Sequence, residues 1–473
     1  MLAAQKDAVS SSEISRSEVS RELMERFSTA RRESDALFDL VRDESLYERP
    51  IAERHRIIFY VGHLEAFDWN LLNDNAAGFG LRSVNPVLDR LFAFGIDPVG
   101  GGLPSDVPSD WPTLGVVRTY VSDVRRNLDA TLDKAILDSD SQGRNGFPLT
   151  ALLNVAVEHR LMHVETLAYM LHQLPLDMKV RPSVMQIVPP YKASGPFGAA
   201  MMPVSAGPAT LGLSRDSASF GWDNEYEAHT VDVPAFEIDQ YKVTNRQYLE
   251  FIGVRGYDTR DLWTDADWDW KSANGISHPK FWEKQERSSS DRSSRPGAWL
   301  YRTMFDRIPF EDAEVLNWPV YVSQAEAAAY ARWAGKSLPT EAEWQRAAYS
   351  APDGSARPYP WGTEPPNASL GNFDLHHWDP MPVDSFARSQ SAFGIHDMLG
   401  NGWEWTSTAF APFAGFEPFP FYRGYSADFF DGKHFVMKGG SSRTASCMLR
   451  STFRNWFQPH YQNVYVGFRC VRR

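Results

Sequence analysis

The segment 158–174, EHRLMHVETLAYMLHQL, places two histidines and a carboxylate at a spacing that could bind a metal ion. His159 and His163 are four residues apart, and Glu165 follows two residues later. On a helix, residues at i and i+4 share one face with Cβ atoms about 5–6 Å apart. The same face carries apolar residues before and after the pair, Leu152, Ala156, Leu167 and Met170. This stripe predicts the inward face of a helical bundle.

A second apolar segment could supply a third ligand. Residues 55–72, HRIIFYVGHLEAFDWNLL, have helical spacing and carry His63. For the HxxxH pair alone, the alternative to a metal site is two core histidines that make hydrogen bonds, because unpaired imidazoles are costly to bury. Three neutral imidazoles without a thiolate suit Fe, Zn or Mn and leave positions for substrate and O2. We therefore predict that His63, His159 and His163 bind one metal ion.

Two neighbouring residues are assigned other roles. Glu165 points about 200° round the helix from His163, so we expect it to orient a ligand rather than to bind the metal. His55 is flanked by Arg54 and Arg56 and is expected to be solvated.

The composition of the chain bounds its size, partners and location. A chain of 473 residues is too long for one hydrophobic core, so we expect two or three domains. The formal net charge of -12 argues against nucleic acid as a partner. No apolar run approaches the roughly 20 residues that span a bilayer, and the polar N-terminus lacks a signal-peptide core. We therefore expect no membrane partner and a cytoplasmic protein.

The chain has a helical half and an aromatic half. Apolar periodicity near residues 15–45, 50–73, 116–138 and 149–174 predicts an antiparallel four-helix bundle over residues 1–180. Residues 181–207 are rich in Pro, Gly and Ser and predict a linker. Residues 208–473 alternate short strand-like runs with Gly- and Trp-rich loops and two clear helices, at 323–337 and 340–349, with Thr340 and Glu343 as a capping box. The predicted fold class is α+β.

Six motifs of the second half, together with HxxxHxE in the first, resemble one family. They are FGWDNE (220–225), VTNRQYLEF (243–251), WPVYVSQAEAAAYARWAGKSLPTEAEWQRAA (318–348), GNGWEWT (400–406), KGGSS (438–442) and FRNW…GFRC (453–470). Their combination resembles the sulfoxide synthases of ergothioneine and ovothiol biosynthesis. The resemblance implies a DinB-like four-helix bundle followed by a formylglycine-generating-enzyme-like domain with a C-type-lectin-like, mixed α/β fold.

The resemblance also implies a chemistry. Fe(II) would be held by the three predicted histidine ligands, and the substrates would be hercynine (trimethylated histidine), O2 and a sulfur or selenium donor. The product has a new bond at imidazole C2. Asn455 and Trp456 match the family's hercynine-contacting motif. An aromatic face attracts a quaternary ammonium and an amide can hydrogen-bond a carboxylate; a structural tryptophan is the alternative for Trp456. Met162 stands where the bacterial branch has a substrate-binding glutamine; an ordinary core methionine is the alternative.

Three departures from the bacterial branch bear on the donor. Phe413 replaces a tyrosine that can donate a proton. Phe457 replaces an acidic residue that could pair with the donor's amino group. The stretch from Leu91 to Val117, where users of γ-glutamylcysteine place carboxylate-binding arginines, contains no Lys or Arg. These changes favour a neutral selenosugar donor, as used by selenoneine synthases. A sulfoxide synthase using cysteine or γ-glutamylcysteine, a thiol-oxidising iron enzyme and a non-catalytic binding module are the alternatives.

Other prominent residues of the second half are expected to be structural. Trp403 and Trp405 belong to a motif of the whole domain, and Arg450 and Arg454 are expected to form ion pairs. The only two cysteines, Cys447 and Cys470, are far apart in the sequence. They exclude a disulfide framework, a Cys-rich zinc site and the paired-cysteine copper site of formylglycine-generating enzymes.

Overall fold

A computed structural model describes residues 21–76, 79–93, 103–135, 147–182, 200–217, 219–285 and 297–473. The chain divides into two compact units, Met1–Pro182 and Ser183–Arg473. No helix in the part of the chain that the structure describes is long and apolar enough to cross a membrane.

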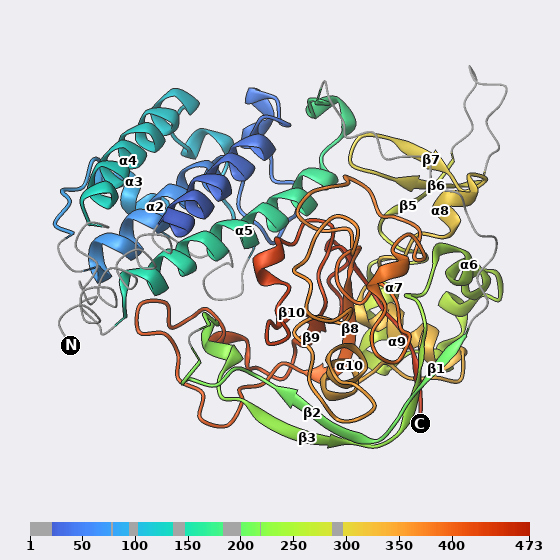
Figure 1. Cartoon of the computed structure of the whole chain (residues 1–473). Helices are drawn as coiled ribbons and strands as arrows, with labels where there is room; N and C mark the ends of the chain where they lie inside the picture. The colour runs from blue at the N-terminus through green and yellow to red at the C-terminus, as the bar shows by residue number, and fades with distance from the viewer. Residues whose placement is uncertain are drawn as a thin grey trace, which may run out of the picture. The chain divides into compact units, whose positions relative to one another are not determined.

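The N-terminal unit is a bundle in which four long helices are described (Figure 1). They span residues 21–38, α2 (Ile57–Asn75), α4 (Leu114–Ala135) and α5 (Leu149–Gln173), and the short helix α3 (Pro86–Leu91) precedes α4. α2 packs against both α4 and α5. This arrangement confirms the helical bundle expected from the apolar periodicity.

The bundle departs from the expected helix bounds at the start of α2. The helix begins at Ile57 rather than near residue 50, because the N-cap residue Arg56 has an extended backbone. His55 therefore lies before α2. It is half-buried rather than solvated, and its ring packs 4.2 Å from that of Phe59.

α2 and α5 are buried on nearly every side, including most of their polar positions. Helices that are apolar all round belong to the interior of a protein. Charged residues on such helices must therefore be paired within the bundle.

The C-terminal unit combines small sheets with short helices (Figure 1). Its strands are β1 (Met201–Val204), β2 (Gly207–Leu211), β3 (His229–Val233), β4 (Phe236–Asp239), β5 (Trp282–Lys284), β6 (Trp299–Arg302), β7 (Arg307–Pro309), β8 (Trp403–Ala409), β9 (Phe435–Lys438), β10 (Asn455–Phe457), β11 (Val466–Gly467) and β12 (Val471–Arg472). The described sheets have the orders β1-β4-β12, β10-β9-β8-β11, β2-β3 and β5-β6-β7. β10 pairs antiparallel with β9, and β11 runs parallel to β8.

The helices of this unit are short, and several begin at a capping box. They are α6 (Asn245–Gly253), α7 (Asp265–Ala273), α8 (Ala313–Leu316), α9 (Gln324–Trp333) and α10 (Glu341–Tyr349). The Thr340 hydroxyl accepts a hydrogen bond from the Glu343 N–H, and the Glu343 carboxylate accepts from the Thr340 N–H. The reciprocal bonds satisfy N–H groups at the start of α10, as the sequence predicted.

The core of the C-terminal unit is aromatic. Trp403 and Trp405 of β8 are 2% and 0% exposed, which agrees with the structural role expected for them. The Trp405 indole N–H donates to the Val322 carbonyl, so its one polar atom is satisfied where it is buried.

The expected linker is shorter at its C-terminal end than residues 181–207. Met201–Val204 form β1, which pairs antiparallel with β4, so Met201 lies opposite Asp239. This strand belongs to the C-terminal unit because its backbone hydrogen bonds are made there. Most of the remaining linker, 183–199, lies outside the described residues.

Candidate functional site

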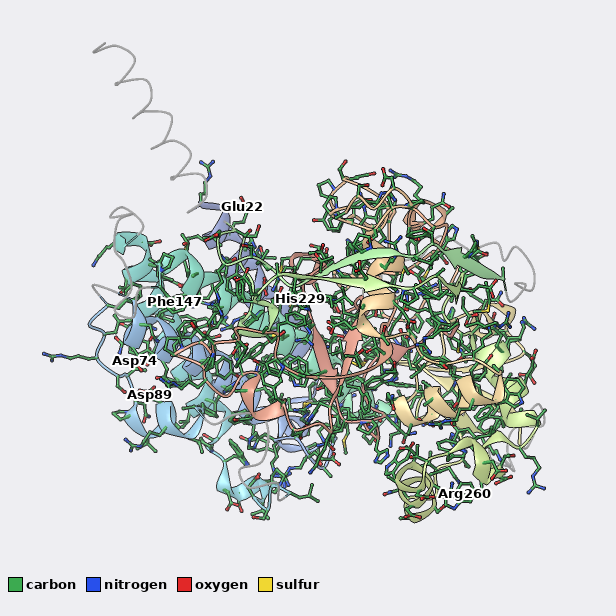
Figure 2. All side chains as sticks on the ribbon, turned by 90° about the horizontal axis from the view of Figure 1, so that it is seen from below. Glu22, Asp74, Asp89, Phe147, His229 and Arg260 are labelled. Atoms are coloured by element: carbon green, nitrogen blue, oxygen red, sulfur yellow. The ribbon has the colours of Figure 1, made fainter. Side chains whose placement is uncertain are left out.

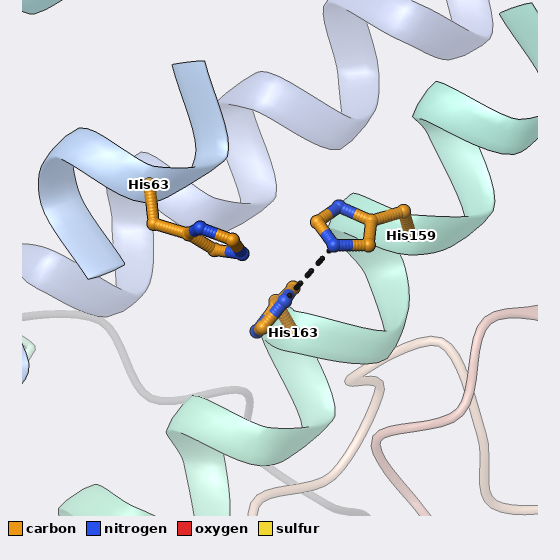
Figure 3. Close-up of side chains that lie close together, drawn as sticks. All are labelled: His63, His159 and His163. Carbon is orange, nitrogen blue, oxygen red and sulfur yellow. Dashed lines mark hydrogen bonds between the residues drawn. The ribbon is translucent and has the colours of Figure 1, made fainter. Parts of the chain in front are cut away.

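The structure brings His63 of α2 together with His159 and His163 of α5 (Figure 3). One candidate ligand atom from each residue lies within 4.8 Å of the others. The Nε2 atoms of His159 and His163 are 3.2 Å apart. Two nitrogens bound to one ion at ~2.1 Å, at right or tetrahedral angles, are about 3.0–3.4 Å apart. The α5 pair therefore has the spacing of two ligands of one ion.

A hydrogen bond fixes the orientation of His63. Its Nδ1–H donates to the Phe92 carbonyl oxygen at 2.7 Å, because a carbonyl can only accept. The Nε2 lone pair is thereby left for a metal ion. Gly62 makes this contact possible, since a Cβ there would lie 2.4 Å from the Phe92 ring.

Aromatic rings enclose the three imidazoles. Phe67 stacks on His159 with ring centroids 3.4 Å apart, and Phe59 stacks on His63 at 4.8 Å. The three histidines are only 3–5% exposed. The rings therefore exclude water from the sides of the site and restrict rotation of the imidazoles.

The burial of the three histidines favours their neutral form. It lowers the pKa of His63 to about 4 and the pKa values of His159 and His163 well below the ordinary range. At neutral pH each ring therefore offers a lone pair without first losing a proton. Three neutral imidazoles fit Fe(II) or another borderline divalent ion.

A network of buried charged side chains lies beside the histidines, and it was not anticipated. Arg160 follows His159 directly and pairs with Glu65 at 3.0 Å and Asp68 at 2.6 Å, both on α2. Arg125 of α4 pairs with the same Glu65. The signal in the sequence was a pair of carboxylates and an arginine inside otherwise apolar helices. The orienting role expected for Glu165, which is half-buried, stays a prediction.

The loop before α4 contains no arginine, but two arginines from a preceding segment bind it. Arg49 and Arg56 both pair with the Asp106 carboxylate, and the Trp111 indole N–H donates to it at 2.7 Å. Trp111 lies 6.0 Å from Phe59, the ring that stacks on His63. The guanidinium groups of Arg49 and Arg56 are thus already paired with a carboxylate of the chain itself.

In the C-terminal unit, β10 carries Asn455 and Trp456, both half-buried. The Trp456 ring stacks on Phe410 with centroids 4.2 Å apart, and Tyr425 and Phe429 lie 5.4 and 5.6 Å away. We call Phe410, Tyr425, Phe429 and Trp456 the aromatic cluster. Several aromatic faces around one position can bind a quaternary ammonium.

The other residues predicted to act on substrate have defined surroundings. Phe457 stacks on Tyr461, with centroids 5.0 Å apart. The Phe413 ring packs under the Arg454 guanidinium and edge-on against His229. His229 begins β3 and is labelled in Figure 2. Met162 lies half-buried on α5, one residue before His163. Their roles toward substrate stay predictions.

The two arginines expected to form ion pairs do so. Arg450 pairs with Glu225, and Arg454 pairs with Glu341 at 2.9 Å. Cys447 and Cys470 form no disulfide within the described residues, and Cys470 is buried.

Comparison with known proteins assigns both units of the chain to families. Residues 26–167 match the DinB superfamily, and residues 191–473 match the Sulfatase-modifying factor enzyme 1-like domain. The chain therefore belongs to the family that joins these two domains. The match confirms the predicted fold class.

Curated relatives narrow the family further. Hercynine oxygenase of Mycolicibacterium smegmatis is 32% identical over 87% of this chain and 89% of its own length. Hercynine oxygenase of Mycobacterium tuberculosis is 37% identical over 55% of this chain and 58% of its own length. Ergothioneine biosynthesis protein 1 of Neurospora crassa is 28% identical over 92% of this chain and 55% of its own length. The chain spans most of the first relative and little more than half of the other two. It belongs to the hercynine oxygenase family and is an enzyme.

Proposed function

We propose that this chain is a non-haem Fe(II) enzyme that uses O2 to form a carbon–selenium or carbon–sulfur bond at imidazole C2 of hercynine. The observation that carries the proposal is the convergence of His63, His159 and His163 in a chain related to hercynine oxygenases. Fe(II) at these histidines would activate O2 and gather hercynine and the donor around one centre.

The bundle residues prepare this centre before substrate arrives. Burial keeps the imidazoles neutral, and the Phe92 carbonyl selects the tautomer of His63. Phe59 and Phe67 keep bulk water from the ligands. Little free energy is therefore needed to rearrange the histidine ligands when the metal binds.

Residues of the C-terminal unit are proposed to recognise hercynine. Trp456, with the rest of the aromatic cluster, suits the trimethylammonium group through cation–π attraction. Asn455 is proposed to hydrogen-bond the carboxylate. In the bundle, Met162 is proposed to contact substrate because it stands where the bacterial branch has a substrate-binding glutamine.

The charged and uncharged side chains of Asp106, Phe413 and Phe457 favour a neutral selenosugar as the donor. The Asp106 carboxylate already pairs with Arg49 and Arg56, so those guanidiniums are not available to a carboxylated thiol. Phe457 offers no charge to an amino group, and Phe413 has no hydroxyl to donate a proton. Together these features support selenium transfer from a sugar donor.

Sulfur transfer from cysteine or γ-glutamylcysteine is the second candidate. It is favoured by the relationship to proteins named for hercynine oxygenation and ergothioneine biosynthesis. The bundle would carry the same iron ligands in either case.

Product masses distinguish these functions. Anaerobic Fe(II)-loaded protein is mixed with hercynine and, in parallel, with a 1-selenosugar, γ-glutamylcysteine or cysteine, and air is then admitted. We expect an adduct of hercynine and the selenosugar, with or without an added oxygen atom. A sulfur adduct alone would establish the second candidate. Sulfinic acid alone would indicate a thiol-oxidising enzyme, and hercynine binding without turnover of any donor would indicate a binding module.

A further inference from the structure

We propose that Arg160 is a positioning residue of the metal centre, which fixes the register of α2 against α5 and thereby the place of His63 relative to His159 and His163. The inference rests on the proposed metal site. Arg160 does not contact the metal or substrate in this role; it acts through the backbone and side chains of the opposite ligand helix.

Arg160 bridges the neighbours of the ligands on the two helices. It follows His159 in the sequence, and its Nη2 donates to the carbonyl oxygen of Leu64 at 3.1 Å. Leu64 is the residue after His63. The guanidinium therefore connects positions directly adjacent to ligands on both helices.

The same guanidinium is anchored over more than one turn of α2. Nη2 also donates to Asp68 at 2.6 Å, and Nη1 lies 3.0 Å from Glu65 and 3.2 Å from the Ser34 hydroxyl. Arg160, Glu65 and Asp68 are each 0–1% exposed. Contacts to a backbone carbonyl and to carboxylates at different heights on α2 define one axial position of that helix against α5.

Axial position matters because the remaining packing between α2 and α5 is mostly apolar. Dispersion contacts are non-directional, and a helix rises ~1.5 Å per residue. Metal sites require ligand distances within about 0.2 Å of their ideal values. A slip of a fraction of one residue would therefore take the His63 Nε2 out of bonding range.

A planar guanidinium suits this task better than an ammonium. Arg presents several donors in a rigid fork, whereas Lys has a single charged centre on a flexible stem. A lysine at position 160 would keep the charge that Asp68 and Glu65 require. It would have to make from one nitrogen the contacts that Arg160 divides between Nη1 and Nη2.

Arg125 provides a matched control within the same network. It pairs with the same Glu65 at 2.7 Å and with Asp35, which lies on the helix 21–38. It thus joins α2 to helices that carry no predicted ligand. Its replacement by lysine perturbs another ion pair of Glu65, in which the arginine is 25% exposed, without touching the α2–α5 register.

The test measures metal affinity of the full chain, prepared metal-free and titrated anaerobically with Co(II) and Fe(II). We expect Arg160→Lys to weaken binding about 10- to 100-fold and to change the visible absorption bands of bound Co(II), which report coordination geometry. We expect Arg125→Lys to bind within about twofold of wild type, even where thermal unfolding shows that it is destabilised.

A second variant keeps the test decisive if Arg160→Lys fails to fold. Arg160→Met with Asp68→Leu removes the pair together, and buried ion pairs replaced by apolar groups commonly retain the fold. We expect this variant to fold, shown by circular dichroism, and to bind Co(II) as weakly as Arg160→Lys. The inference about Arg160 would be overturned by wild-type affinity and spectrum in both Arg160 variants, or by an equal loss of metal affinity in Arg125→Lys. Either result would leave the proposed function standing. A wild-type chain that binds neither ion would overturn the proposed function as well.

Discussion

The histidine site of the bundle and the aromatic cluster of the C-terminal unit are built in opposite ways. His63, His159 and His163 lie on two long helices, where the 3.6-residue period sets which side chains share a face. The rings of the aromatic cluster come from β10 and from loops distant in the sequence. Regular helices thus position the groups proposed to do chemistry, whereas a short strand and the segments around it position the aromatic cluster proposed to recognise hercynine.

The two regions also differ in burial and charge. The imidazoles are almost wholly buried beside paired charges, whereas Trp456 is half-buried among other rings. Buried groups in a closely packed interior tolerate little displacement. We therefore expect substitutions of the three histidines to remove metal binding, and substitutions in the aromatic cluster to change substrate affinity only.

The largest effect is expected from the metal ligands. His63→Ala, His159→Ala or His163→Ala should each lower hercynine-dependent O2 consumption at least about a thousandfold, because loss of a ligand removes the centre that activates O2. Iron content measured on the same samples should fall in parallel. His172→Ala, on the same helix as two ligands, is the control and should keep both. Full turnover in His63→Ala would refute the assignment.

A smaller effect is expected at Trp456. Trp456→Leu should raise the KM for hercynine about 10- to 30-fold, because a desolvated cation–π contact contributes ~2 kcal/mol. Trp456→Phe should raise it only a few-fold, since an aromatic face remains. Bound iron should stay at the wild-type level in both. An unchanged KM would place the trimethylammonium group elsewhere.

The donor preference is expected to respond to Asp106. Asp106→Asn removes the carboxylate that pairs with Arg49 and Arg56, so a carboxylated thiol could bind them. The ratio of kcat/KM for γ-glutamylcysteine over the selenosugar should rise about tenfold. Asp110→Asn in the same loop, where the side chain accepts from the Val107 N–H, is the control and should leave the ratio unchanged. A constant ratio in both variants would show that these arginines do not select the donor.

The smallest effect is expected at Phe413. Phe413→Tyr adds a hydroxyl next to Arg454 and His229 and so offers a proton donor that the chain lacks at this position. We expect a few-fold change in the ratio of coupled product to oxidised donor, measured by mass spectrometry, with the KM for hercynine unchanged. An identical product ratio would mean that protons come from another group.

The contrast between the two regions explains what the sequence could predict. The HxxxH spacing and one more histidine on an apolar helix predicted three side chains that the structure does bring together. The buried ion pairs of Arg160 with Asp68 and Glu65 could not be predicted from residue spacing, because they join helices about ninety residues apart in sequence. The partners of Trp456 were equally hidden, since loop conformation depends on long-range packing.

The ends of helices and strands could likewise be predicted only where the sequence signal is local. The capping box at Thr340 and Glu343 marked the start of α10 correctly because its signal is local. β1 was assigned to a linker because its pairing partner, β4, is distant in sequence and the strand itself is short. His55 was expected to be solvated because its stacking on Phe59 depends on where α2 begins.

The most direct test of the account is X-ray absorption at the iron edge of the anaerobic Fe(II)-loaded full chain. We predict one iron per chain whose spectrum is fitted by three imidazole ligands and light-atom solvent ligands, and which loses one imidazole contribution or all bound iron in His63→Ala. A spectrum with sulfur ligands, with fewer than three imidazoles, or with no change in His63→Ala would contradict the claim that these three histidines hold the metal.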